Sequence, residues 1–161
     1  MRKWALLPAC ALLLLPVAAQ AQQVEGHVVG GAGFALDNGF HTFATGGGGF
    51  EYRPLNFVGF GGEGAVLLAE GGGADFWSTD VIGRFNMRGS SMAWQPFVAA
   101  GHSGILLARE ADQPNLWRVR IGVKHWTRAH RGVIAEFVDT IVVERGVPHY
   151  LPAFRVGITF R

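Results

Sequence analysis

The stretch Trp117–Trp126 reads Trp-Arg-Val-Arg-Ile-Gly-Val-Lys-His-Trp and alternates apolar with polar residues. A β-strand sends successive side chains to opposite faces. One face of this segment would therefore be apolar, and the other would carry the positive charges of Arg118, Arg120 and Lys124. Two settings suit such a strand. In a soluble sandwich the charges would lie in water, and in a small membrane barrel the apolar face would contact lipid while the charges point into the lumen.

Seven further segments alternate in the same way, and turn-forming residues separate them. Asn38-Gly39 is a strong hairpin signal, Arg53–Asn56 holds a proline suited to a turn, and Gly71–Asp75 predicts a flexible loop. No segment keeps a 3.6-residue period, so long helices are not expected. Evenly spaced short strands predict an all-β sandwich or an up-and-down barrel. The eight expected strands are residues 23–37, 40–52, 57–70, 76–87, 94–108, 117–126, 133–143 and 150–160.

The polar residues opposite the apolar faces favour the barrel. In a narrow lumen, an unpaired charge costs several kcal/mol, so acids and bases should balance there. We expect a lumenal ion-pair network of five acids and five bases: Glu25, Glu51, Glu63, Asp80 and Glu136 with Arg84, Arg118, Arg120, Lys124 and Arg155. The sequence thus predicts an eight-stranded antiparallel up-and-down transmembrane β-barrel, whose strands need only about 9–11 residues to cross a bilayer.

Two further patterns agree with eight strands. Aromatic residues near segment ends are typical of an interfacial girdle: Phe50, Tyr52, Phe57, Trp94, Trp126, Tyr150 and Phe160. The connections also alternate in charge. Those after the odd-numbered strands hold acids (Asp37, Glu70, Asp75, Glu110, Asp112 and Glu144, with Arg109 and Arg145), and those after the even-numbered strands hold only bases (Arg53, Arg88, Arg128 and Arg131). The basic turns are expected to be periplasmic and the acidic loops external.

The first 21 residues have the pattern of a cleaved secretory signal peptide. Arg2 and Lys3 precede an apolar core at residues 6–17, and Ala19-Gln20-Ala21 is a small-x-small cleavage site. We expect residues 1–21 to be the signal and 22–161 to form the barrel domain. Cleavage would remove Cys10, the chain's single cysteine, and with it disulfide and thiol chemistry. It would leave 12 basic and 12 acidic residues, which gives no nucleic-acid footprint.

The sequence offers little catalytic or cofactor chemistry. Gly59, Gly61 and Gly64 match G-x-G-x-x-G, but no helix follows, so a dinucleotide site is not expected. The six histidines show no metal-ligand spacing. His102-Ser103 is one candidate catalytic pair. His125-Trp126-Thr127 is similar to the His-x-Ser of outer-membrane lipid A deacylases, with Glu136 or Asp139 as a possible acid, but threonine stands in place of serine.

Several segments resemble the small bacterial outer-membrane barrels of the OmpA/OmpX-like superfamily. They are residues 122–126, 128–132 and 133–137, the closing run 154–161, and the Pro-aromatic-x-x-x-Gly pattern at 96–101. The resemblance implies an eight-stranded barrel, insertion by the outer-membrane assembly machinery through the C-terminal strand, and no catalytic site. No separate peptidoglycan-binding domain is expected.

The sequence therefore predicts a monomeric, non-enzymatic outer-membrane barrel. Its partners would be outer-membrane lipid and lipopolysaccharide, with no nucleic acid, no cofactor and no metal. Its role would be structural or in surface contact. A lipid A deacylase-like hydrolase and a soluble periplasmic lipocalin-like ligand binder are the alternatives.

Overall fold

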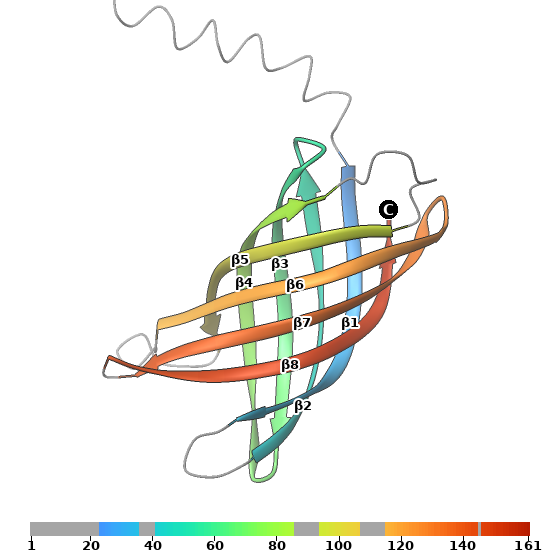
Figure 1. Ribbon diagram of the computed structural model, residues 1–161. Coiled ribbons are helices and arrows are strands. Elements are labelled where there is room, and N and C mark those ends of the chain that lie inside the picture. Colours follow the sequence, from blue (N-terminus) through green and yellow to red (C-terminus); the bar gives the residue numbers. More distant parts are fainter. Residues whose placement is uncertain (1–22, 36–40, 86–93, 107–114, 145) are drawn as a thin grey trace, which may run out of the picture.

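The computed structural model describes residues 23–35, 41–85, 94–106, 115–144 and 146–161, and these form a closed barrel of eight antiparallel strands (Figure 1). Each strand pairs with its neighbours in the sequence, and β1 pairs with β8 to close the ring. The predicted all-β, eight-stranded up-and-down barrel is thereby confirmed. The strands are β1 (Gln23–Ala35), β2 (His41–Arg53), β3 (Val58–Ala69), β4 (Gly72–Arg84), β5 (Trp94–Ile105), β6 (Asn115–Arg128), β7 (Arg131–Glu144) and β8 (Val147–Phe160).

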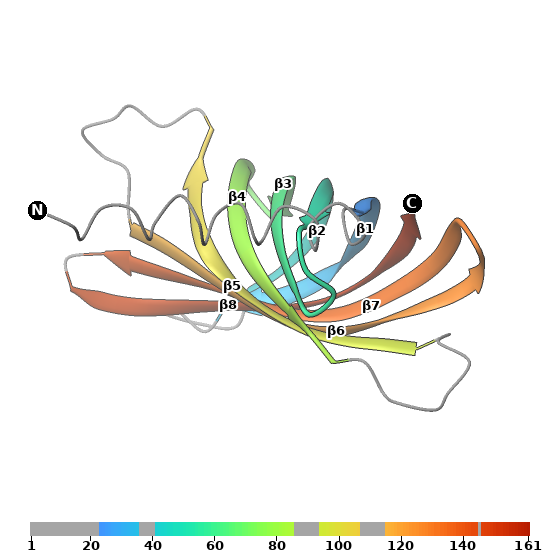
Figure 2. The ribbon, with the colours of Figure 1, turned by 90° about the horizontal axis from the view of Figure 1, so that it is seen from above.

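The strands cross at a steep angle on the two sides of the barrel, so that β1–β4 run across β5–β8 (Figures 1 and 2). Such tilt is what closure of a small barrel requires. The start of β1 and the end of β8 lie at one end, which we call the termini end. The β3–β4 and β7–β8 turns lie at the other end, which we call the loop end.

Several hairpins are tighter than the sequence predicted. The expected flexible loop at Gly71–Asp75 is wrong, because β4 begins at Gly72, directly after a turn in which Gly71 has a φ of 93°. The β7–β8 connection likewise closes at Gly146, with a φ of 83°. L-residues with side chains rarely adopt this left-handed conformation, so glycine permits turns this short. Strands β6 and β7 also extend closer together, with β6 ending at Arg128 and β7 beginning at Arg131.

Side chains alternate between the interior and the outer wall along most of each strand, with an irregularity in β6 between Trp126 and Arg128. In β6 the inward Arg118, Arg120 and Lys124 are buried, whereas the outward Trp117 and Ile121 are 55% and 58% exposed. Five of the buried apolar side chains form a small cluster inside the ring (Val29, Ile82, Phe97, Ala99 and Ile134). The interior is therefore mainly charged and the exterior mainly apolar.

Candidate functional site: the lumenal ion-pair network

All ten residues expected in the lumenal network lie on the inward face of the barrel, and none is more than 5% exposed. The pleat determines this placement, because each residue has the inward parity of its strand. Their charged atoms form two clusters at different depths along the barrel. We call these the termini-side cluster, nearer the termini end, and the central cluster.

The termini-side cluster joins two carboxylates to three cations. Glu25 and Glu51 share Arg84, whose Nη2 lies 2.6 Å from Glu25 Oε2 and 2.5 Å from Glu51 Oε2. Lys124 Nζ bridges the same two carboxylates at 2.9 and 3.0 Å. Arg53 also donates to Glu25. Residues from four strands, β1, β2, β4 and β6, are thus tied together across the lumen.

The central cluster is built around Glu63 of β3. Its carboxylate accepts from Arg155 Nη1 at 2.6 Å, Arg118 Nη2 at 2.7 Å and Arg120 Nη1 at 3.3 Å. His27 Nε2 lies 3.1 Å from the same group. Two further acids complete the cluster: Arg155 Nη2 lies 2.5 Å from Glu136 Oε1, and Arg120 Nη2 lies 2.7 Å from Asp80 Oδ2.

Phe97 separates the two clusters inside the ring. Arg120 and Lys124, one from each cluster, both approach its face, with their charged atoms 5.9 Å from the ring centroid. This distance suits a cation–π contact. The lumen between the clusters is therefore filled with side chains rather than open.

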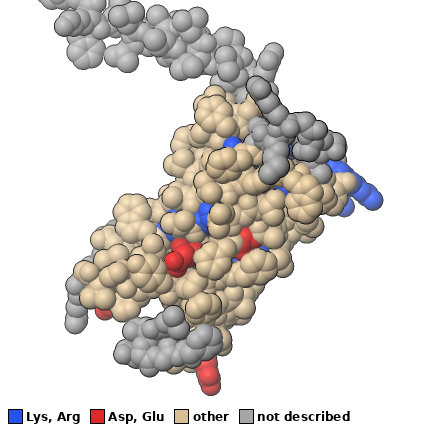
Figure 3. All heavy atoms as spheres, in the orientation of Figure 1, with Lys and Arg blue, Asp and Glu red and all other residues tan. Residues whose placement is uncertain are grey.

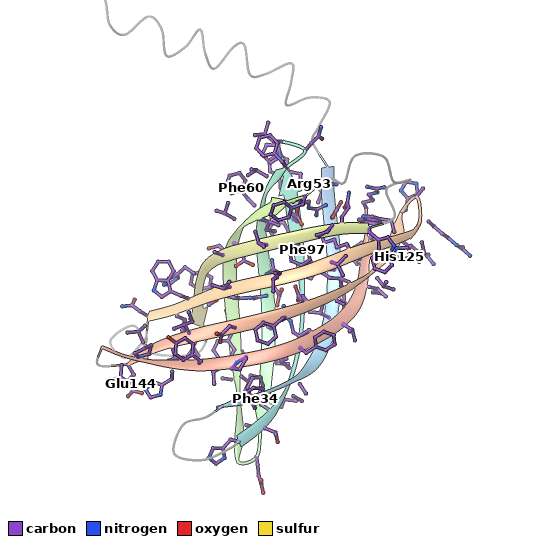
Figure 4. The ribbon with its side chains drawn as sticks, in the orientation of Figure 1. Phe34, Arg53, Phe60, Phe97, His125 and Glu144 are labelled. Atoms are coloured by element: carbon purple, nitrogen blue, oxygen red, sulfur yellow. The ribbon has the colours of Figure 1, made fainter. Side chains whose placement is uncertain are left out.

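Aromatic and amide side chains close the lumen at the termini end. Trp126 is 8% exposed, and its indole N–H donates to Gln95 Oε1 at 2.9 Å. The same Gln95 oxygen accepts from Arg84 Nη1 at 3.0 Å, which joins this contact to the termini-side cluster. Arg161 lies over the Trp126 ring, 4.3 Å from its centroid. In Figure 4, Arg53 and His125 lie at this end and Glu144 at the other.

Two residues lie elsewhere than the sequence suggested. The sequence predicts Trp126 in the outer girdle, but it points inward, because it shares the parity of Lys124. The sequence predicts Arg53 in a basic turn, but it is 6% exposed and bound to Glu25. The described lumen consequently holds six basic residues against five acidic ones, so the expected five-to-five balance is wrong by Arg53. Its inward parity with Glu51, two residues earlier, was the available signal.

The outer wall matches the face expected for lipid contact. Large apolar side chains project from every strand, among them Phe154 (58% exposed), Ile158 (59%) and Val133 (48%). Six of the seven aromatic residues expected at the girdle are on this exposed surface: Phe50, Tyr52, Phe57, Trp94, Tyr150 and Phe160. Figure 3 shows a mainly uncharged surface, with basic side chains projecting at the termini end and acidic ones at the loop end.

The expected charge sorting of the connections is partly visible in the described residues. Exposed Arg128 and Arg131 flank the β6–β7 turn, and exposed Glu70 and Glu144 lie at the β3–β4 and β7–β8 turns. Asp37, Arg88, Arg109, Glu110, Asp112 and Arg145 fall outside the described residues, as does the expected signal peptide at residues 1–21.

The candidate hydrolase residues are not brought together. His125 faces outward and stacks on Trp94, with ring centroids 4.2 Å apart, while Glu136 faces inward and binds Arg155. Asp139 faces outward, but His125 pairs with Val133, six residues before Asp139 on the same strand. Six residues of strand span roughly 20 Å.

His102 and Ser103, the other candidate catalytic pair, lie on opposite sides of the barrel wall. His102 lies outside beside Trp117, with ring centroids 5.7 Å apart, whereas the neighbouring Ser103 is buried inside. Among the described residues, no group of three or more histidine, cysteine, aspartate or glutamate side chains is arranged to hold a metal ion. No helix in the described part of the chain is long and apolar enough to cross a membrane.

The barrel is similar to several solved structures. Neisserial surface protein A is 10% identical, with a TM-score of 0.66, covering 85% of this chain and 95% of that one. This is the fold of the small outer-membrane β-barrels. The N-terminal β-barrel domain of Pseudomonas aeruginosa OprF is 16% identical, with a TM-score of 0.56 over 86% and 99% of the two chains.

A third neighbour is Ail, the attachment invasion locus protein of Yersinia pestis, solved with the heparin analogue sucrose octasulfate. It is 12% identical, with a TM-score of 0.52 over 86% and 98% of the two chains. At these identities the likeness concerns the fold. No protein-family model matches the sequence, and no curated protein sequence matches it.

Proposed function

We propose that this protein is a monomeric outer-membrane barrel whose wall contacts lipid and lipopolysaccharide and whose lumen is closed by the ion-pair network. Its role is structural in the envelope or in contact at the cell surface, without enzymatic activity. The fold shared with outer-membrane barrels supports this proposal.

The observation that carries the proposal is the inverted distribution of side chains. Charged groups such as Glu63 and Arg155 are buried, while large apolar groups such as Ile121 and Phe154 are exposed around the barrel. Soluble monomers rarely expose a contiguous apolar surface of more than a few hundred Å². A lipid bilayer removes this cost, since it is the solvent that such a wall requires. The same observation argues against a soluble periplasmic lipocalin-like protein.

We further propose that the termini end is periplasmic. Both ends of the described chain lie there, and the exposed Arg128 and Arg131 flank the short β6–β7 turn. The outward Phe154 and Phe160 of β8 are the residues that we expect the outer-membrane assembly machinery to engage. The acidic loop end then faces the exterior.

Hydrolase activity is the weaker alternative. The outer wall separates His125 from Glu136, and the strand register separates it from Asp139. A catalytic histidine needs a nucleophile and an orienting acid within hydrogen-bond reach. Deacylation of lipopolysaccharide by the purified protein, abolished by His125→Ala, would contradict our proposal.

Cell fractionation tests the location directly. We expect the full chain in the outer-membrane fraction, resistant to salt and alkaline washes and released by detergent. Recovery in the periplasmic extract without detergent would contradict the proposal and favour the soluble ligand binder.

A further inference from the structure

Basic side chains gather at the termini end of the barrel, around the β6–β7 turn. Arg128 ends β6, Arg131 begins β7 and Arg161 follows the last residue of β8, and all three are exposed. Arg128 and Arg131 pair across the turn, and Arg131 also pairs with Phe160, which places Arg161 next to the turn. Basic side chains project from this end in Figure 3. We call these three residues the arginine patch.

One guanidinium group of the arginine patch is held in place by the chain. The Arg161 backbone N–H donates to the His130 carbonyl at 3.3 Å, and its Nε–H donates to the Ala129 carbonyl at 2.9 Å. The guanidinium lies over the Trp126 ring, 4.3 Å from its centroid, which suits a cation–π contact. These contacts leave both Nη groups without an acceptor among the described residues. Arg161 therefore presents two donor groups in a fixed orientation.

No carboxylate side chain of the described residues neutralises the arginine patch. Glu25 and Glu51, the acids in this half of the lumen, are buried and bound within the termini-side cluster. The exposed acids of the described chain, Glu70 and Glu144, lie at turns of the opposite end. Three positive charges outweigh even the single negative charge that a terminal carboxylate at Arg161 adds. The patch therefore fits an anionic partner.

The arginine patch lies directly beyond the lipid-facing wall. Phe160, which pairs with Arg131, is 47% exposed, and the neighbouring outward pair Val133 and Ile158 continues the apolar surface toward the middle of the wall. In a bilayer the patch is therefore level with the headgroups, where lipid phosphates are the nearest anions. The planar fork of arginine matches phosphate oxygens. A zwitterionic headgroup also brings an ammonium group, for which the described residues of this end offer no exposed carboxylate, so a headgroup with a net negative charge fits better.

We propose that the arginine patch binds the phosphate of an anionic phospholipid, such as phosphatidylglycerol, in the leaflet at the termini end. The Arg161 Nη groups donate to the phosphate oxygens, and Arg128 and Arg131 supply further positive charge. This inference rests on the proposed membrane location and adds a specific lipid site to it. The wall contacts lipid in general, whereas the patch selects one class of headgroup.

The test places the protein in nanodiscs of dimyristoyl phosphatidylcholine that contain increasing fractions of dimyristoyl phosphatidylglycerol. Indole ¹⁵N–¹H signals report locally, since the Trp126 ring lies under Arg161 while the outward Trp77 and Trp117 lie nearer the loop end. We expect the Trp126 signal to shift and saturate as the phosphatidylglycerol fraction rises, and the Trp77 and Trp117 signals to show no saturation. Absence of a saturable Trp126 shift would overturn the proposal.

Two substitutions of equal charge change separate a local site from net charge. Arg131→Gln removes a side chain that makes no hydrogen bond within the described chain. It should raise the phosphatidylglycerol fraction at half-saturation about 2–5-fold, as expected for one basic residue at an anionic membrane surface. Val147→Glu, at the opposite end, makes the protein more negative by the same amount and should leave the Trp126 titration unchanged. Equal weakening by both variants would assign the effect to net charge and overturn the site.

Arg161→Lys tests the donor assignment, because it keeps the charge and removes the planar fork. It should also raise the half-saturating fraction, and unchanged binding would overturn the role of the Nη groups. Gel mobility with and without boiling checks the folding of each variant. If Arg161→Lys does not fold, Arg131→Gln still decides whether the patch binds the lipid.

An acidic soluble polymer is the competing partner, and polyglutamate is its probe. A Trp126 shift caused by polyglutamate in nanodiscs of phosphatidylcholine alone, together with no saturable response to phosphatidylglycerol, would overturn the lipid assignment. Protein that inserts into nanodiscs and shows heat-dependent mobility but no phosphatidylglycerol response contradicts this inference alone. Failure to insert contradicts the proposed membrane location, so the two failures are distinguishable.

Discussion

Arg120 links three of the five lumenal carboxylates, so it is the residue at which a single change should matter most. It lies 2.7 Å from Asp80, 3.3 Å from Glu63 and 3.4 Å from Glu136. Arg120→Leu would leave buried carboxylates without their cation. Breaking a buried pair costs about 3–5 kcal/mol, and we expect a loss of that size in urea unfolding from lipid vesicles. Arg128→Leu, at an exposed position of the same strand, is the control, and equal stability of the two variants would refute this role.

The termini-side cluster gives a second prediction, because its charges are not balanced. Glu25→Gln would leave Arg53, Arg84 and Lys124 facing Glu51 alone. We expect a loss of about 3 kcal/mol in unfolding free energy, by the same cost of unpaired buried charge. Adding Lys124→Met returns the excess of basic over acidic residues in this cluster to one, as in the unsubstituted protein. The double variant should therefore recover about 0.5–3 kcal/mol, the range of coupling between contacting residues. Strict additivity of the two changes in a double-mutant cycle would contradict the network.

At this scale the sequence predicted which side chains face inward but not which atoms meet. Parity along each strand places Glu63 and Arg155 inside, yet their contact depends on the register of strands far apart in the sequence. Arg53 and Trp126 were misplaced because a residue at a strand end can belong to the strand or to the turn. The alternation alone does not say where a strand stops.

At the scale of elements, the tight turns depend on glycines with positive φ. Gly146→Ala at the β7–β8 turn should cost about 1–2 kcal/mol, the penalty for an L-residue in the left-handed region. Gly64→Ala is the matched control, since a Cβ there would meet nothing within 4 Å and the backbone is extended. The two variants are compared by urea unfolding in vesicles. An equal cost at both positions would show that the turn imposes no such demand.

The outward face of the strands gives a depth-dependent prediction. Ile121 lies near the middle of β6 and is 58% exposed, whereas Val147 begins β8 and is 55% exposed. Arginine on the lipid face of a membrane barrel costs about 2–4 kcal/mol at the midplane and about 0–1 near the interfaces. Ile121→Arg should therefore destabilise the barrel in vesicles much more than Val147→Arg. Equal effects would mean that the wall does not face a bilayer.

The whole molecule was the easiest level to predict. Eight alternating segments with short connections leave few closed arrangements, and the buried charges favour a barrel over a sandwich. Strand lengths were underestimated at several hairpins, since Gly72–Asp75 and Val147–Pro148 look like loop sequence but continue the ladder.

The central claim is that this chain is a membrane barrel with an apolar wall and a charged, closed interior. Gel mobility of detergent-extracted protein, compared with and without boiling, tests it most directly. A closed barrel keeps its hydrogen-bonded ring in detergent until heated, so we predict a faster-migrating unboiled band and a slower boiled one. A single band of unchanged mobility under both conditions would contradict the account.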